Sequence, residues 1–339
     1  MLVVPIKHMN YVLFSTGKDV KMRTCWVLDH PAHVRLLAPF IRESGTSDLI
    51  IACDRFEVRA LLDKGDGIIP RRQTIFVPRP IGKRRYRKAL QRMSIVKKFL
   101  KGKSVKRIIS IGAPLELRVA KRLGVGKRIY VSDTEVNHLA HKLSRKFVTD
   151  VIIPTHWNSE IDGSALENWQ KAECTIHRLD GLHGHVHLRP QLRPKEVSDP
   201  PKILVRRLKG NGIHDSEEII PIPDEILHDL DLVNADEDEY DQNPWELDKV
   251  VSSSDGVITQ SVTLASEAVI LNVPTLLVSK AKRGFIDRLQ ANGYPLFIWS
   301  GEENKDEIMS QFFAGLALTE FIESEEWPDA KNEFEAFIS

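Results

Sequence analysis

Short apolar segments alternate with amphipathic helical segments along this chain, and that alternation limits its fold more than any other feature. The apolar segments 22–28 and 49–53 are each followed by a segment with helical periodicity, at residues 33–43 and 57–62. A repeated strand–helix unit builds a parallel sheet whose two faces are covered by helices. The sequence therefore predicts an α/β fold with parallel sheets.

The alternation stops and then starts again, which indicates two domains, and a length of 339 residues agrees with that number. Residues 155–201 are polar and rich in proline and histidine, and a new apolar strand follows at 202–205. We expect two Rossmann-like domains with a cleft between them. The predicted parts are an extension at 1–21, an N-terminal domain at 22–154, an inter-domain passage at 155–201, a C-terminal domain at 202–304, and C-terminal helices at 305–339 that could return to the N-terminal domain.

The composition is that of an ordinary globular protein, with 42% hydrophobic and 28% charged residues. No apolar run approaches the roughly 18 residues that span a bilayer. Residues 1–21 lack the long apolar core of a signal peptide. Three cysteines without paired spacing fit a reducing compartment. We expect a cytoplasmic protein, and membrane association would require a lipid-binding surface.

Charge is strongly segregated, although the formal net charge is only +1. No acidic residue occurs between Gly67 and Leu115, whereas the acidic segment 215–248 has no Lys or Arg. The two blocks could face each other across the cleft or meet separate partners.

Helix 83–103 lies within the basic block. Its excess of cations could bring it to anionic lipid headgroups at a membrane surface. Nucleic acid is not an expected partner, because the segment has few aromatic residues to stack on bases and matches no nucleic-acid motif. We expect the apolar stripe of this helix to face the core, and it consists of Tyr86, Leu90, Met93, Val96, Phe99 and Leu100.

Residues 255–275 say more about function than any other segment. Apolar residues 256–258 run through a polar turn into a helix that begins near Thr263 and carries Glu267. Such a unit places free backbone N–H groups at the carboxyl edge of a parallel sheet, where phosphate groups bind. Glu267 could then accept hydrogen bonds from a ribose. The alternative is that the polar residues only cap the helix and Glu267 only favours its dipole.

Two polar segments follow predicted strands of the N-terminal half. Asp29, His30 and His33 come after the first strand, and His33 could serve as a general base. Asp133 and Glu135 follow a later strand, and they could orient a hydroxyl group or accept its proton. Helix capping and acidic first-turn residues explain both segments about as well.

Two further segments could bind an anion or a metal. Cations beside glycines follow strand 202–205, and they suit a diphosphate because glycine allows close approach and the cations supply charge. These residues are Arg206, Lys209, Gly210, Gly212 and His214. Segment 183–187 reads H-x-H-x-H, which could be a zinc site, but no nearby cysteine completes a ligand set. We therefore expect no metal.

Taken in order, these segments resemble a known family. They read WVLDHPAHVRLLAPFIRESG, IIACDRFEVRALLDKGDG, IISIGAPLELRVAKRLG, IYVSDTEVNHLAHKLSRKFVTDVIIP, DGLHGHVHL, ILVRRLKGNGIHD and the 255–275 unit. Over residues 22–300 the chain is similar to uncharacterised, mainly archaeal proteins of the GT-B type. These in turn are similar to UDP-GlcNAc 2-epimerases and to the N-acetylglucosaminyltransferase that forms lipid II.

The resemblance implies a UDP-sugar substrate held mainly by the C-terminal domain, with no essential metal and no cofactor. Relatives usually carry Gly-Gly or Ser-Gly before the Thr of this turn, whereas here Thr259, Ser261 and Val262 replace small or glycine positions. The residues that would hold the nucleotide-sugar are Arg206, Lys209, Gly210, Gly212, His214, Ser261, Val262, Thr263 and Glu267. The residues on the acceptor side would be Asp29, His30 and His185.

Three functions therefore compete. We favour a GT-B glycosyltransferase that moves a sugar from a UDP-activated donor to an acceptor, which could be lipid-linked or close to a membrane. His33, Asp133 and Glu135 are its candidate catalytic residues. The second function is that of a 2-epimerase-like enzyme, which needs two acid/base groups at the sugar C2 position. The third is that of a non-catalytic binding protein on a degenerate GT-B scaffold, and the glycine-poor turn favours it.

Overall fold

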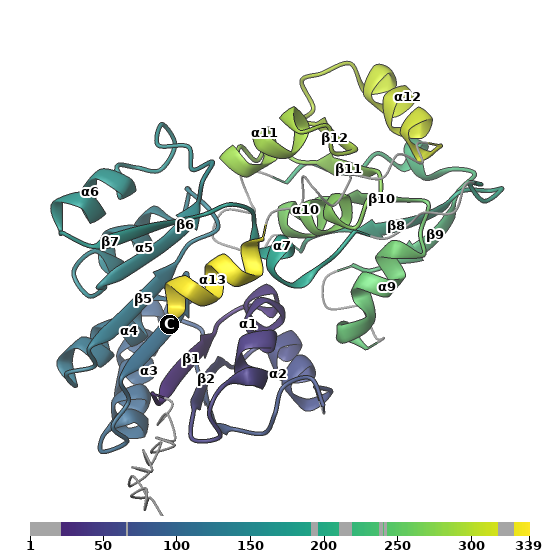
Figure 1. The fold of residues 1–339 in the computed structure, drawn as a ribbon. Coiled ribbons are helices and arrows are strands. Elements are labelled where there is room, and N and C mark those ends of the chain that lie inside the picture. The colour runs from purple at the N-terminus through teal and green to yellow at the C-terminus, as the bar shows by residue number, and fades with distance from the viewer. Residues whose placement is uncertain are drawn as a thin grey trace, which may run out of the picture.

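The computed structural model describes residues 22–65, 67–190, 196–209, 219–236, 240, 243–317 and 329–339, and it contains two parallel sheets (Figure 1). The first sheet has seven strands in the order β3-β2-β1-β4-β5-β6-β7. Every pairing between its strands is parallel. The strands are β1 (Thr24–Leu28), β2 (Leu49–Cys53), β3 (Gln73–Val77), β4 (Arg107–Ile111), β5 (Lys127–Val131), β6 (Asp150–Pro154) and β7 (Thr175–Leu179).

The second sheet has five strands, also all parallel, in the order β12-β11-β10-β8-β9. The strands are β8 (Lys202–Arg206), β9 (Asp231–Asn234), β10 (Gly256–Thr259), β11 (Thr275–Val278) and β12 (Leu296–Trp299). The predicted α/β fold with two Rossmann-like parallel sheets is therefore confirmed.

Helices cover both faces of the first sheet, because its central strands are apolar on both sides. Trp26 and Leu28 of β1 pack into one core, whereas Cys25 and Val27 pack into the other. The helices on the first of these faces are α1 (Pro31–Glu43), α2 (Phe56–Asp63) and α13 (Ala330–Ile338), and those on the second are α3 (Arg85–Leu100), α4 (Pro114–Arg122), α5 (His138–Ser144) and α6 (Ala165–Lys171).

The first sheet extends past the predicted boundary at residue 154. Residues 155–201, expected to form only a passage between domains, contain α6, β7 and the short helix α7 (His183–His187). β7 pairs with β6 from Thr175 to Leu179. It was missed because it is an edge strand whose residues are mostly polar and partly exposed.

The C-terminal helices divide between the two sheets. α12 (Lys305–Leu316) packs on the second sheet, where Phe312 is fully buried. α13 instead returns to the first sheet, where the Phe334 ring lies 5.1 Å from that of Phe40. Lys127 Nζ also donates to the carbonyl of Phe337 at 3.2 Å. The remaining helices of the second domain are α9 (Leu247–Ser252), α10 (Val262–Ile270), α11 (Gly284–Ala291), η1 (Asp224–Leu227) and η2 (Pro244–Glu246).

The apolar stripe predicted for the basic helix α3 is only half buried, which corrects that expectation. Val96, Phe99 and Leu100 lie in the core, but Tyr86 is 73% exposed and Leu90 is 66% exposed. The C-terminal half of α3 packs on the sheet, and the first two turns project their apolar side chains into solvent. Among the described residues, no helix is both long and apolar enough to cross a membrane.

Candidate functional site

A cavity lies where the two sheets face each other. Its walls come from the carboxyl ends of β5 and β6, from the loop before α7, and from α10. Ligands bind at such strand ends in open parallel sheets. The lining residues include four that matter for the chemistry below: Asp133, His183, Thr263 and Glu267.

The first turn of α10 forms one wall of this cavity. Ser261 caps the helix, and its hydroxyl accepts a hydrogen bond from the Leu264 amide at 3.3 Å. The first intrahelical bond runs from the Ala265 amide to the Ser261 carbonyl. The amides of Val262 and Thr263 therefore have no acceptor within the helix, and they carry the positive end of its dipole.

The polar residues of the glycine-poor turn hold the neighbouring loop in place. Thr259 donates its hydroxyl to the Arg206 carbonyl at 3.2 Å. Gln260 is 6% exposed, accepts from the Leu208 amide at 2.8 Å and donates to the Ile220 carbonyl at 2.7 Å. The sequence analysis missed the role of Gln260, although a polar residue between a buried strand and a helix was a signal for it.

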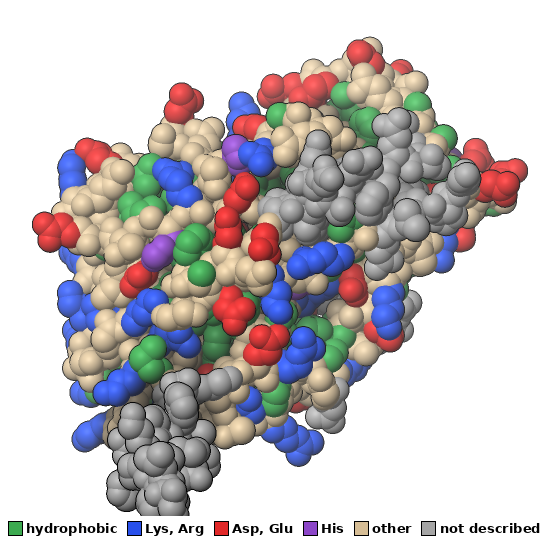
Figure 2. Space-filling model, viewed as in Figure 1, with side chains coloured by type: hydrophobic (Ala, Val, Ile, Leu, Met, Phe, Trp, Pro, Cys, Tyr) green, Lys and Arg blue, Asp and Glu red, His purple; other side chains and the backbone are tan. Residues whose placement is uncertain are grey.

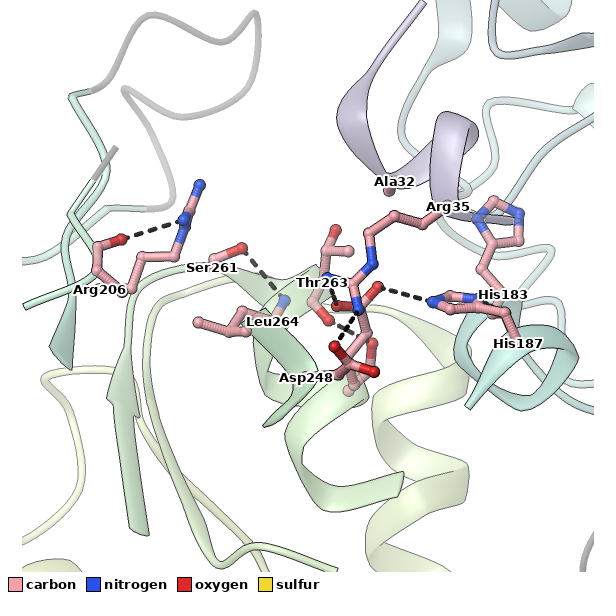
Figure 3. Close-up of polar contacts among 12 residues, drawn as sticks. Ala32, Arg35, His183, His187, Arg206, Asp248, Ser261, Thr263 and Leu264 are labelled. Carbon is pink, nitrogen blue, oxygen red and sulfur yellow. Dashed lines mark hydrogen bonds and ion pairs between the residues drawn. The ribbon is translucent and has the colours of Figure 1, made fainter. Parts of the chain in front are cut away.

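Glu267 lies one turn further along α10 and is only 7% exposed. Its carboxylate lies 3.7 Å from Arg35 Nη1 and 3.6 Å from His187 Nε2, so residues of α1 and α7 meet it from the other domain (Figure 3). Burial by itself would raise the pKa of Glu267, but Arg35 and then His187 outweigh it and lower the pKa to about 2. Glu267 is therefore a carboxylate at neutral pH.

Asp133 and His183 form a pair on the opposite wall of the cavity. Asp133 Oδ2 lies 3.4 Å from His183 Nδ1. Burial lowers the pKa of His183, even though Asp133 opposes that shift. Burial would raise the pKa of Asp133, but His183 and His33 outweigh it and lower the pKa. At neutral pH the pair is thus a carboxylate beside a neutral imidazole, which can accept a proton.

His33 and His30 stand at the start of α1, where the sequence analysis expected them. His30 Nδ1 accepts from the Ala32 amide at 3.3 Å, so His30 and not Asp29 caps the helix. Burial is the main reason that the pKa falls to about 4 for His33 and about 3 for His30. Both rings are therefore neutral at physiological pH.

Asp29 is held by a buried arginine of α3. Arg92 is 2% exposed, and its Nη2 donates to Asp29 Oδ1 at 2.6 Å. The same guanidinium donates through Nε to Glu116 at 2.5 Å. Asp29 therefore anchors the β1–α1 loop against α3 and α4, which is a structural role next to the cavity.

Of the predicted site residues, Asp133, Thr263 and Glu267 line the cavity, whereas the other described ones, Glu135 and His185 among them, do not. Glu135 Oε1 accepts from the amides of Asn158 at 3.0 Å and Gly284 at 3.2 Å, so it ties the first domain to the start of α11. His185 accepts from the Leu182 amide at 3.0 Å and lies 3.2 Å from Tyr294 Oη. His185 lines a second cavity beside the first.

The H-x-H-x-H segment does not gather its side chains at one point. His183 meets Asp133, His185 meets Tyr294, and His187 meets Glu267. In the part of the chain that the structure describes, no group of three or more His, Cys, Asp and Glu side chains is placed to hold a metal ion. The sequence analysis considered His183 and His187 only as metal ligands, and it missed both carboxylate pairings.

The cations after β8 are only partly described. Arg206 Nη1 donates to the Ala235 carbonyl at 3.1 Å, and the charge of Arg206 contributes to lowering the pKa of Glu267. Lys209 is exposed. Gly210, Gly212 and His214 lie outside the described residues.

Some buried polar atoms at and beside the cavity have no hydrogen-bond partner among the described residues. Native proteins leave few such atoms, so a local group of them calls for a physical reason. A polar ligand that reaches several of them at once is such a reason. In the cavity lining these atoms are both ring nitrogens of His183, and His187 Nε2 and Asp248 Oδ1 belong to the ion pairs that reach Glu267 and Arg35.

The sequence matches no protein-family model and no curated protein. Its fold, in contrast, matches many solved structures over almost the whole chain. The UDP-GlcNAc 2-epimerase of Methanocaldococcus jannaschii has a TM-score of 0.61 at 12% identity, covering 93% of this chain and 98% of that one. The UDP-GlcNAc 2-epimerase of Neisseria meningitidis, solved with UDP-GlcNAc bound, has a TM-score of 0.59 at 11% identity, covering 93% and 98%.

A glycosyltransferase matches as well. MurG of Acinetobacter baumannii has a TM-score of 0.53 at 11% identity, covering 93% of this chain and 99% of that one. Two parallel-sheet domains and likeness to both kinds of enzyme define the fold as GT-B-like. That class of fold, which the resemblance implied, is confirmed.

Proposed function

We propose that this chain is a GT-B glycosyltransferase that uses a UDP-activated sugar in the cavity between its domains. One observation carries the proposal: the Asp133–His183 pair faces the start of α10 and Glu267 across a single cavity. An acceptor hydroxyl needs a base, and a nucleotide-sugar needs groups for its diphosphate and ribose. The base lies on one wall, and the groups for the diphosphate and ribose lie on the other. The solved neighbours support a nucleotide-sugar ligand, since several were solved with UDP or UDP-GlcNAc.

In the proposed reaction, His183 accepts the proton of the acceptor hydroxyl while Asp133 stabilises the imidazolium that forms. The hydroxyl oxygen attacks the sugar C1 atom, and the bond from C1 to the diphosphate breaks. Negative charge then grows on the departing diphosphate. The amides of Val262 and Thr263 and the nearby Arg206 stabilise that charge electrostatically. Glu267 accepts hydrogen bonds from the ribose hydroxyls.

Release of UDP from a panel of UDP-sugars, with water as the default acceptor, tests this proposal. We expect slow UDP release by the wild type. Asp133→Asn should lower the rate by at least about 10²-fold while UDP still binds, because it removes the group that supports the base. Glu267→Ala should weaken UDP binding itself. A wild type that binds no UDP at millimolar concentration would contradict the proposal and favour a non-catalytic scaffold.

A 2-epimerase-like activity is the second candidate, because two separate imidazoles, His33 and His183, are held neutral beside Asp133. Removal and return of the C2 proton need two such groups. Incubation with UDP-GlcNAc in heavy water separates the two reactions. Deuterium at C2 would support epimerisation, and its absence together with UDP release would support transfer.

We further propose that the start of α3 contacts a membrane surface, which would bring a lipid-linked or membrane-proximal acceptor to the cavity. Tyr86 and Leu90 are one helical turn apart and exposed, and the exposed cations Lys83, Arg84, Arg85 and Arg87 surround them. Figure 2 shows Lys and Arg side chains gathered on the side where Figure 1 labels α3 and α4. An apolar pair ringed by cations suits anionic lipid headgroups.

The start of α3 also lies on the functional side of the sheet. α3 follows β3, so it begins at the same carboxyl edge that carries Asp29 and Asp133. Arg92, less than two turns from Tyr86, contacts Asp29 directly. A membrane bound at Tyr86 would thus lie near the cavity mouth.

Sedimentation with vesicles tests the membrane contact. We expect binding to vesicles that contain phosphatidylserine and not to vesicles of phosphatidylcholine alone, and we expect salt to weaken it. The double substitution Tyr86→Ser with Leu90→Ser should abolish binding. Leu139→Ser is the matched control, since Leu139 is 67% exposed on another helix. Equal binding by the double variant and the control would contradict the contact.

A further inference from the structure

We propose that Arg35, a residue of the N-terminal domain, pairs with the diphosphate of the bound donor. The inference rests on the proposed function, because it adds a recognition group for the same substrate. It assigns to the N-terminal domain a share of donor binding, which the sequence analysis gave mainly to the C-terminal domain.

Arg35 is a buried cation whose side chain forms ion pairs, but no hydrogen bond, with the described residues. It is 8% exposed, although it lies on α1 and reaches across to the other domain. Its nearest carboxylates are Glu267 at 3.7 Å and Asp248 at 3.9 Å. Hydrogen bonds between charged groups are about 2.7–2.9 Å long, so these are ion pairs only. No hydrogen bond from Arg35 to another described residue is formed. Since its pairings with described residues are these two long ion pairs, the guanidinium can still donate hydrogen bonds to an anion with several oxygens.

The position of Arg35 fits a diphosphate. Figure 3 shows its side chain reaching to the first turn of α10, beside Thr263. That turn also contains the amides of Val262 and Thr263, which have no acceptor within the helix. A diphosphate seated on these amides lies within reach of the guanidinium, which binds phosphate oxygens in a bidentate manner.

Charge balance leads to the same conclusion. The side chains around this point include three carboxylates, those of Asp133, Asp248 and Glu267. A diphosphate would add further negative charge, so a nearby cation is needed to hold it. When ribose hydroxyls donate hydrogen bonds to the Glu267 carboxylate, they weaken its ion pair with Arg35. The guanidinium can then bind the phosphate oxygens.

Calorimetry with uridine and with UDP tests the inference, because the ratio of their affinities isolates the diphosphate. Arg35→Gln should lower the ratio of UDP affinity to uridine affinity by about tenfold or more, since it removes a charge-assisted contact. Uridine affinity itself should stay the same or rise, because Glu267 loses a competitor. Arg35→Lys should restore part of the ratio, since a lysine keeps the charge without the fork.

Arg42→Gln is the matched control, because Arg42 lies on the same helix and is exposed. It should leave the affinity ratio unchanged. If Arg35→Gln changes both affinities by the same factor, Arg35 acts only through domain contact and the inference is wrong, while the proposed function stands. If the wild type binds neither ligand, the nucleotide site fails and the inference fails with it.

Discussion

Single buried residues decide what the cavity can do. Two carboxylates, the half-buried Asp133 and the buried Glu267, have lowered pKa values, because each lies beside a histidine of α7 and Glu267 also pairs with Arg35. Burial keeps His183 neutral. The cavity therefore offers an acceptor of protons on one wall and fixed negative and positive groups on the other. This arrangement forms because the fold brings together segments that lie far apart in the sequence.

His185 predicts a measurable pH dependence of stability. Burial, aided by Arg288 and Arg189, lowers its pKa from 6.5 to about 3. Below pH 6.5 the unfolded chain binds a proton on His185, whereas the folded chain does not. The free energy of unfolding is therefore highest above that pH and falls as the pH drops towards the pKa of His185 in the folded state. Each such group adds a slope of up to about 1.4 kcal/mol per pH unit.

Chemical denaturation between about pH 7 and pH 4 measures this slope. His185→Gln should make the loss of stability on acidification shallower than in the wild type, because glutamine does not titrate. Identical slopes for the two proteins would show that His185 is not held neutral by burial.

At this scale the sequence predicted part of the site. Thr263, Glu267 and Asp133 were predicted from their places after strands, and the structure puts all three in one cavity. His183 and Arg35 were missed, because each gains its role from a partner more than 40 residues away. Nothing in a local pattern distinguishes Arg35 from a solvated residue on the polar face of α1.

Among the elements, the short helix α7 does the most to join the domains. It contacts α1 and α13 of the first domain and α10 of the second. Gly184 allows this approach, since a Cβ atom there would lie 2.6 Å from Ile270 Cδ1. His183 then reaches Asp133 in the first domain, and His187 reaches Glu267 in the second. The position of α7 thereby sets the distance between the two walls of the cavity.

The start of α11 is the second tight contact between the domains, and it yields a stability prediction. A Cβ atom on Gly284 would lie 2.0 Å from the His156 carbonyl and 3.0 Å from Glu135 Oε1. Gly284→Ala should therefore destabilise the protein by about 2 kcal/mol or more, because backbone must move to make room.

Thermal unfolding of Gly284→Ala beside Gly126→Ala measures this cost. At Gly126 a Cβ atom would meet only the Lys106 carbonyl at 3.8 Å, an ordinary contact, so that variant should melt close to the wild type. An unchanged melting temperature for Gly284→Ala would mean that α11 does not pack against the 156–158 loop as described.

Periodicity was a good guide to the elements where strands are buried on both faces. β1, β2, β10 and β11 are buried throughout and were predicted within two residues of their ends. β7 and β9 were missed, since both are edge strands with polar, exposed residues. The prediction that the whole apolar stripe of α3 faces the core was wrong for a related reason. Periodicity shows which residues share a face, but not how far along that face the core extends.

For the whole molecule, the sequence predicted two parallel-sheet domains but not how closely they meet. Contacts that cross the boundary include Arg35 with Glu267, Glu135 with Gly284, and Trp245 Nε1 with the Leu61 carbonyl at 2.7 Å. Each joins side chains or backbone groups whose pairing no single segment encodes. The return of α13 to the first sheet adds a further link between the chain end and the N-terminal domain.

A crystal structure of the full chain with UDP tests the central proposal most directly. We expect the diphosphate on the amides of Val262 and Thr263 and the ribose hydroxyls within hydrogen-bonding distance of Glu267. The Asp133–His183 pair should face the diphosphate across the cavity. Crystals soaked in millimolar UDP that show the nucleotide elsewhere, or show none in the cavity, would contradict the proposal that this is a nucleotide-sugar site.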